Sequence, residues 1–119
     1  MHRYTRVLAG MFLATIVCHG GPARAQSAYP AKPIRIIVPY TAGGLADVFV
    51  RNVGQGLAAR LGQPVIVENK PGANTLIGAE AAAHAPADGY TLLFCSMSTL
   101  ALNVGTYKKL PYDPIKDFA

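Results

Sequence analysis

The sequence predicts an α/β fold built on a parallel βαβαβ sheet. The first observation is a set of three short runs rich in apolar residues, at 34–39, 64–69 and 90–97, which are typical of strands. The second is that helix-length segments with apolar or small residues, 45–61 and 76–84, separate these runs. Crossovers of this length favour parallel strands with right-handed connections, and we expect helices on both faces of the sheet.

The first strand and the first helix have the clearest patterns. The run "IRIIVP", from Ile34 to Pro39, suits a strand that is covered on both faces. The helix carries apolar residues at every fourth position, and Gly62 stands where a helix commonly ends in a left-handed glycine. Gly54 and Gly56 are expected to weaken the helix by roughly 1 kcal/mol each. The apolar positions are Leu45, Phe49, Val53, Leu57 and Leu61.

The later elements follow the same alternation. "PVIVEN", residues 64–69, predicts the second strand, and "KPGAN" predicts a turn. A helix rich in small residues is predicted from Leu76 to about His84, where "APADG" terminates it. "YTLLFCSM", residues 90–97, predicts the third strand, and Cys95 is expected to be a small buried apolar residue within it.

The first 25 residues have the composition of a secretory signal peptide. Basic residues at the start precede an almost unbroken apolar run, 7–17, and Ala23-Arg24-Ala25 supplies the small-x-small cleavage pattern. A transmembrane anchor fits less well, because the apolar run is shorter than the ~20 residues that cross a bilayer. We expect cleavage after Ala25, a periplasmic location and a mature chain that does not span the membrane.

Charge and cysteine content limit what the mature chain, residues 26–119, can do. Removal of Arg3, Arg6 and Arg24 leaves eight basic residues against six acidic ones, a net charge of +2, and no basic run remains. Nucleic acid is therefore not an expected partner. Cys95 is the single cysteine after cleavage, so the mature chain forms no internal disulfide.

Glycines and polar residues follow all three predicted strands, at 40–44, 69–74 and 96–99. Parallel sheets bind ligands at the carboxyl ends of their strands, near the switch point in strand order. Gly43 and Gly44 lie where the first helix begins, and the N–H groups of a helix start favour an anion. Three such loops at one edge of a sheet predict a binding site for an anionic group.

Each candidate side chain also has a structural interpretation. Asp47 either caps the first helix or contacts a hydroxyl or amine of the ligand. Asn74 and Thr75 suit an N-cap as well as a binding loop, and the hydroxyl residues Ser96, Ser98 and Thr99 suit a cap of the following helix. The convergence of three loops favours the binding interpretation.

The sequence offers little support for catalysis. It contains no nucleophile-elbow, phosphate-loop or dinucleotide-binding motif and no metal-ligand spacing, so we expect no cofactor and no metal. His84 is the single histidine after cleavage and is expected at the surface, near a helix end. A secreted hydrolase-like enzyme using Cys95 or Ser96 remains the alternative from a different functional class.

Four blocks of sequence resemble one family in order and spacing: "YPAKPIRIIVPYTAGGLADVFVR", "LGQPVIVENKPGANTLIGA", "APADGYTLLF" and "YKKLPYDPIKDF". This is the Bug (TctC-like) family, the periplasmic substrate-binding proteins of tripartite tricarboxylate transporters. The resemblance covers essentially all of 29–119. It implies a two-lobed periplasmic-binding-protein-like fold that closes on a small carboxylated compound, performs no chemistry and delivers the compound to the membrane components of the transporter.

The resemblance also implies the ligand-binding residues. They come from three loops: Tyr40, Thr41, Ala42, Gly43, Gly44 and Asp47 from the first, Ala73 and Asn74 from the second, and Ser96, Ser98 and Thr99 from the third. Leu45 and Ala46 replace the glycine and small polar residue that members often have, and Asn74-Thr75 replaces a more glycine-rich pair. The volume of the pocket and the identity of the ligand are left open by these departures.

The length of the chain adds a further expectation. In this family the chain builds part of the first lobe before it forms the second, and residues 26–119 would supply only the first part of the N-terminal lobe. Without the second wall of the cleft we expect weak or no ligand binding. A truncated, non-functional gene product is the second alternative.

Overall fold

The structure is a computed structural model that describes residues 29–118. The predicted signal peptide, residues 1–25, lies outside the described residues. The strands are β1 (Ile34–Val38), β2 (Val65–Asn69) and β3 (Thr91–Leu93). The helices are α2 (Leu45–Leu61), α3 (Leu76–Ala83) and α4 (Asn103–Thr106), with a short 3-10 turn η1 (Ala73–Thr75) and a π-helical segment η2 (Ser98–Leu102). The predicted βαβαβ order is confirmed.

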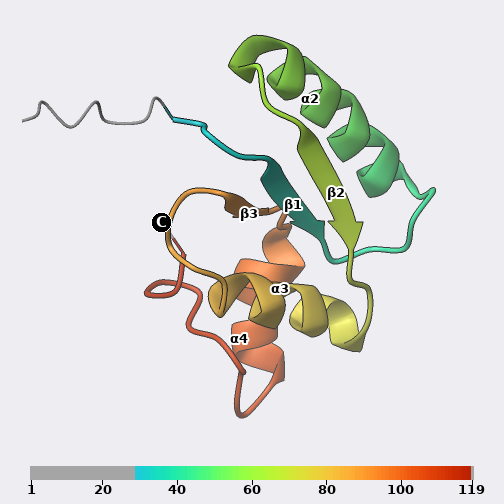
Figure 1. Cartoon of the computed structure of the whole chain (residues 1–119). Helices are drawn as coiled ribbons and strands as arrows, with labels where there is room; N and C mark the ends of the chain where they lie inside the picture. Colours follow the sequence, from blue (N-terminus) through green and yellow to red (C-terminus); the bar gives the residue numbers. More distant parts are fainter. Residues whose placement is uncertain (1–28, 119) are drawn as a thin grey trace, which may run out of the picture.

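The three strands form one parallel sheet in the order β2-β1-β3. Ile36 in the centre of β1 faces Val67 of β2 on one side and Leu92 of β3 on the other. Figure 1 shows α2 on one side of this sheet and α3 on the other. The chain therefore forms the predicted three-layer arrangement, with β1 between both neighbours.

The core lies on β1, as its apolar run predicts. Ile36 and Val38 pack with Val50 of α2 on one face of the sheet. Ile37 points to the opposite face and is fully buried. On that face α3 approaches closely at Gly78, where an added Cβ would lie 2.7 Å from the Cβ of Pro39. A side chain at position 78 would push α3 away from the sheet.

Helix α2 begins and ends where the sequence predicts. Gly62 adopts φ 67° and donates its N–H to the carbonyl of Ala58, as in a left-handed C-terminal cap. The helix face that packs on the sheet differs from the stripe at every fourth residue. The buried positions of α2 are Asp47, Val50 and Gly54, whereas Leu45 is 89% exposed and Phe49 is 56% exposed.

Gly54 explains this choice of face. An added Cβ there would lie 3.2 Å from Cγ1 of Val65, so the glycine allows α2 to approach β2. Gly54 therefore serves close packing as well as weakening the helix. Gly56 on the same helix has open space around it and serves no such purpose among the described residues.

Strand β3 is shorter than predicted, and the expectation for Cys95 is wrong. The strand ends at Leu93, and Cys95 is exposed outside it. Arg35 of β1 donates its N–H to the carbonyl of Tyr90. In a parallel pair, every second residue of one strand donates to the same neighbouring strand, so the donors on this side of β1 are the odd-numbered residues. The donor that would extend this pairing belongs to residue 39, which is a proline and has no N–H.

The remaining predicted elements agree closely with the structure. Strand β2 begins one residue later than predicted, and α3 ends at Ala83, immediately before His84. His84 is exposed at this helix end, with Nδ1 2.9 Å from the carbonyl oxygen of Glu80. Within the described residues, no helix is long and apolar enough to cross a membrane.

Candidate functional site

The loop between β1 and α2 presents main chain rather than side chains. Gly43 has φ 80°, a conformation that other residues rarely adopt, whereas Gly44 has φ −78° and ψ 172°, which are ordinary values. Gly44 is the N-cap of α2, and no side chain caps this helix. The first helical hydrogen bond runs from the N–H of Val48 to the carbonyl of Gly44 at 3.0 Å. The N-terminus of a long helix thus remains open to an anion from outside the loop.

Asp47 folds back onto this loop. Its Oδ2 accepts the N–H of Gly43 at 2.8 Å and Nε of Arg51 at 3.0 Å, and its Oδ1 accepts Nδ2 of Asn69 at 2.9 Å. The Arg51 hydrogen bond, followed by those from Gly43 and Asn69, lowers the pKa of the Asp47 carboxyl to about 2. Asp47 is 3% exposed. Asp47 is therefore a buried carboxylate at neutral pH whose donors all come from the protein.

Two residues that are not among the predicted ligand-binding residues, Arg51 and Asn69, join the first loop to β2. Nη2 of Arg51 donates a hydrogen bond to Oδ1 of Asn69 at 3.0 Å. Asn69 then donates to the carbonyl of Tyr40 at 3.2 Å as well as to Asp47. The i,i+4 spacing of Asp47 and Arg51 on a predicted helix was a signal for this ion pair. The role of Asn69 depends on the register of the sheet and has no local signal.

The first and third loops meet at the switch point of the sheet. In the order β2-β1-β3 the chain passes from β1 to β2 on one side and later returns to form β3 on the other side of β1. Open sheets form their ligand crevices where the strand order reverses in this way. Here the Tyr40 hydroxyl donates to Oγ of Ser96 at 2.7 Å. These two predicted site residues, 56 positions apart in sequence, are brought into direct contact.

The predicted site residues of the second and third loops differ in how far they are exposed to solvent. Ala73 and Asn74 are exposed, and the Asn74 side chain donates to Oδ1 of Asn103 at 2.7 Å. Ser98 is half-buried at the start of η2. Thr99 is fully buried, and its hydroxyl donates to that of Thr75 at 2.9 Å. The Thr99 side chain therefore faces the interior of the protein.

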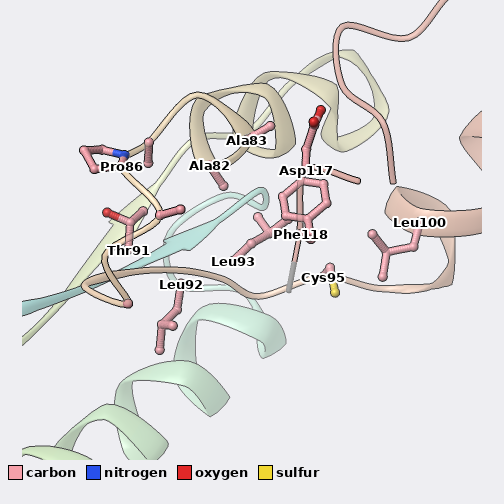
Figure 2. A pocket seen from close by; sticks show the side chains of 13 residues that line it. Ala82, Ala83, Pro86, Thr91, Leu92, Leu93, Cys95, Leu100, Asp117 and Phe118 are labelled. Carbon is pink, nitrogen blue, oxygen red and sulfur yellow. The ribbon is translucent and has the colours of Figure 1, made fainter. Parts of the chain in front are cut away.

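Two of the hollows on the described surface bear on the candidate site and its surroundings. One, of about 370 Å³, adjoins the first loop and is lined by Tyr40, Leu45, Ala46, Phe49 and Phe94. The other, of about 520 Å³, lies along β3 and the end of α3, and its labelled lining in Figure 2 includes Leu93, Leu100 and Phe118. None of the predicted site residues lines this larger hollow. The larger hollow is therefore separate from the candidate site. The candidate site is defined by its hydrogen-bond donors and not by a cavity.

The groups considered for catalysis do not form a reactive cluster. The part of the chain that the structure describes contains no group of three or more histidine, cysteine or acidic residues that would hold a metal ion. His84 lies against its own helix, and the hydroxyl of Ser96 is held by Tyr40. Cys95 is exposed and lines the larger hollow. No hydrogen bond among the described residues joins His84 to Cys95 or Ser96.

Comparison with known proteins gives consistent matches. Residues 49–119 match the family model described as "Tripartite tricarboxylate transporter family receptor". BugT of Bordetella pertussis is 45% identical over 116 residues, which cover 95% of this chain and 35% of BugT. The chain spans about a third of the length of the curated relatives that it matches.

Solved structures match over most of the described residues. A structure described as a periplasmic transporter is 53% identical, with a TM-score of 0.72 over 75% of this chain and 30% of that chain. MatC from Rhodopseudomonas palustris, solved with bound malate, is 36% identical with a TM-score of 0.70 over 75% of this chain and 30% of MatC. Another R. palustris protein, solved with adipate, is 32% identical with a TM-score of 0.69 over 72% of this chain and 29% of that protein.

Proposed function

This chain belongs to the tripartite tricarboxylate transporter receptor family, the Bug (TctC-like) periplasmic binding proteins, and we propose that it captures a small carboxylated compound for such a transporter without performing chemistry. The compound would pass to the membrane components of the transporter. Two structural neighbours, which carry malate and adipate, support this ligand class. Malate and adipate differ in the chain between their carboxylates, so the feature they share is the carboxylate itself.

The single observation that carries the proposal is the open N-terminus of α2 at the switch point of the sheet. In our proposal one carboxylate of the ligand lies against the main chain of 41–44 and accepts N–H groups from the first turn of α2, with Tyr40 and Ser96 beside it. The N–H of Gly43 is donated to Asp47 and shapes the loop. The main chain at Ala73 and Asn74 and the hydroxyl of Ser98 approach from the other loops. Asp47 and Thr99 are buried and hydrogen-bonded to the protein, so we assign them a supporting role in place of a ligand contact.

We also propose that residues 1–25 are a cleaved signal peptide and that 26–119 form the first part of an N-terminal lobe. The length of the relatives supports the second part of this proposal, since this chain covers 35% and 32% of two of them. The other lobe would supply the second wall that excludes water from the ligand. The nucleotide sequence after the codon for Ala119 tests the division directly: an in-frame second lobe supports it, and a stop codon favours a truncated remnant.

A thermal-shift screen of the full-length mature protein against malate, adipate and other small carboxylates tests the function. Binding to the folded state raises the melting temperature, because ligand binding stabilises the native state by mass action. Gly44→Val is the informative variant: its backbone angles suit any residue, and an added Cβ would lie 3.4 Å from its closest neighbour, the carbonyl oxygen of Thr41. We expect the variant to fold and to bind about tenfold more weakly.

Gly56→Ala is the matched control, because it adds a methyl group to the same helix in open space. It should leave the ligand-dependent shift unchanged. Equal shifts for Gly44→Val and the wild type would remove the first loop from the site. The appearance of a chemical product from any stabilising compound would favour the enzyme alternative, and Ser96→Ala and Cys95→Ala would then identify its nucleophile.

A further inference from the structure

The turn before α3 has an unfavourable backbone conformation at three consecutive residues. Ala73, Asn74 and Thr75 have φ values of 44°, 50° and 73°. Asparagine tolerates the left-handed region, but alanine does so less readily and β-branched threonine least of all. Local sequence preferences therefore disfavour this turn. Contacts from another part of the chain must hold it in this conformation.

Asn103, the first residue of α4, supplies the most direct of these contacts. Its side-chain amide donates to the main-chain carbonyl of Asn74 at 3.0 Å, and its Oδ1 accepts the side-chain amide of Asn74 at 2.7 Å. Asn103 is fully buried. The paired hydrogen bonds fix both the main chain and the side chain of Asn74 relative to α4.

Thr99 and Tyr112 extend the same arrangement. The Thr99 hydroxyl donates to the Thr75 hydroxyl at 2.9 Å, and the Tyr112 hydroxyl donates to the carbonyl of Thr99. Thr75, Thr99, Asn103 and Tyr112 are all at most 5% exposed. Every buried polar side-chain atom in the described part of the chain has a hydrogen-bond partner. A fully satisfied buried network of this kind favours a single conformation.

We propose that Asn103 is a positioning residue for the ligand site. It holds Asn74, and with it the main chain of 73–75, in the left-handed conformation that presents this turn to the ligand, and it does not contact the ligand itself. The inference rests on the proposed function, in which the second loop lines the site. A merely structural Asn103 would stabilise the fold and leave affinity unaffected in the folded protein.

The test uses Asn103→Ala in the full-length mature protein, with malate and adipate as the probes. We expect the dissociation constant of whichever probe binds to rise about tenfold, since a lost buried hydrogen-bond partner has an effect of this size. Hydrogen–deuterium exchange of the ligand-free protein should increase at residues 73–76 and stay unchanged in α2. Val50→Ala is the control, because Val50 is a core residue 3% exposed on the opposite face of the sheet, so it should lower stability without changing affinity at temperatures well below the melting point.

A second substitution separates positioning from general support. Glycine adopts φ 50° without strain, so Asn74→Gly in the Asn103→Ala background should recover affinity severalfold. Two results together would assign Asn103 a structural role only. Asn74→Gly would not recover affinity, and the affinity losses of Asn103→Ala and Val50→Ala would be proportional to their losses of stability. Unchanged affinity and exchange in Asn103→Ala would overturn the inference and leave the proposed function intact.

If neither probe nor any other carboxylate binds the wild type, the exchange measurement tests only whether Asn103 holds the turn at 73–75. In that case the proposed function fails. Faster exchange confined to residues 73–76 in Asn103→Ala would support Asn103 as the residue that holds the turn. Unchanged exchange would reject that role as well.

Discussion

Asp47 shows how one side chain shapes the proposed carboxylate site. Its carboxylate accepts the N–H of Gly43, which fixes the loop, and its negative charge lies in the first turn of α2, near the positive end of the helix. The charge of Asp47 is balanced by Arg51 at 3.0 Å. A ligand carboxylate in our proposal therefore approaches a loop whose internal negative charge is already neutralised.

The lowered pKa of Asp47 predicts how stability depends on pH. The folded-state pKa is about 2, below the ordinary value near 3.9, so Asp47 stabilises the fold fully above about pH 4 and this contribution is lost as the pH falls toward 2. The melting temperature of Asp47→Asn should lie below that of the wild type at neutral pH, and the difference should shrink between pH 4 and pH 2. Gln55→Ala, at an exposed position on α2, removes no titratable group and is the control; its difference from the wild type should show no such convergence. A constant difference across this range would contradict the assignment.

Some of these residue contacts follow from local sequence, and others do not. The N-terminal position of Asp47 and its spacing from Arg51 are visible on a predicted helix. The burial of Thr99 and the pairing of Asn74 with Asn103 depend on how two segments 29 positions apart meet in space. Hydroxyl and amide residues after a strand suit a binding loop or an internal network equally well. The sequence therefore predicts the loops of the site better than the direction of each side chain.

Close packing of α3 on the sheet gives a prediction at the scale of elements. An alanine Cβ at Gly78 would lie 2.7 Å from the Cβ of Pro39 and 3.0 Å from the carbonyl oxygen of Lys70, and neither the ring nor the main chain moves easily. We expect Gly78→Ala to lower the free energy of unfolding by about 1–3 kcal/mol despite the higher helix propensity of alanine. Gly56→Ala has open space and should raise it by up to about 1 kcal/mol. Urea denaturation measures both, and equal effects would contradict the close contact.

The helices also show where periodicity alone is insufficient. Helix α2 was predicted with its correct bounds because Gly62 marks the end and the apolar residues recur with helical spacing. Its packing face is set by Gly54 and Val50, because a glycine lets the helix approach β2 more closely than Phe49 would. Strand β3 ends early for a similar reason, since Pro39, immediately after the neighbouring strand β1, lacks the N–H that would extend the pairing. Both features depend on a partner element rather than on the segment itself.

At the scale of the whole molecule, the parallel sheet places the three predicted loops at its carboxyl edge, and in our proposal they form one wall of the ligand site. The order β2-β1-β3 follows from crossovers on opposite faces and fits the α/β class that the alternating pattern predicts. Leu45 and Phe49 leave an apolar surface beside this wall. A small ligand bound to one wall would remain largely in contact with water, whereas binding pockets bury most of the surface of their ligands.

A chimera tests whether the remainder of a relative completes the site. MatC has the same fold over 75% of this chain and was solved with malate, and this chain covers 30% of MatC. Residues 1–119 joined to the part of MatC that follows the matched region should bind malate after export, because the second wall then excludes water from the ligand. Residues 26–119 alone should bind at least about tenfold more weakly, since in our proposal they supply only one wall of the cleft. Calorimetric titration of malate into both proteins measures the difference. The Gly44→Val form of the chimera is the control for binding at the first loop, and equal affinity of the short chain and the chimera would show that one wall suffices.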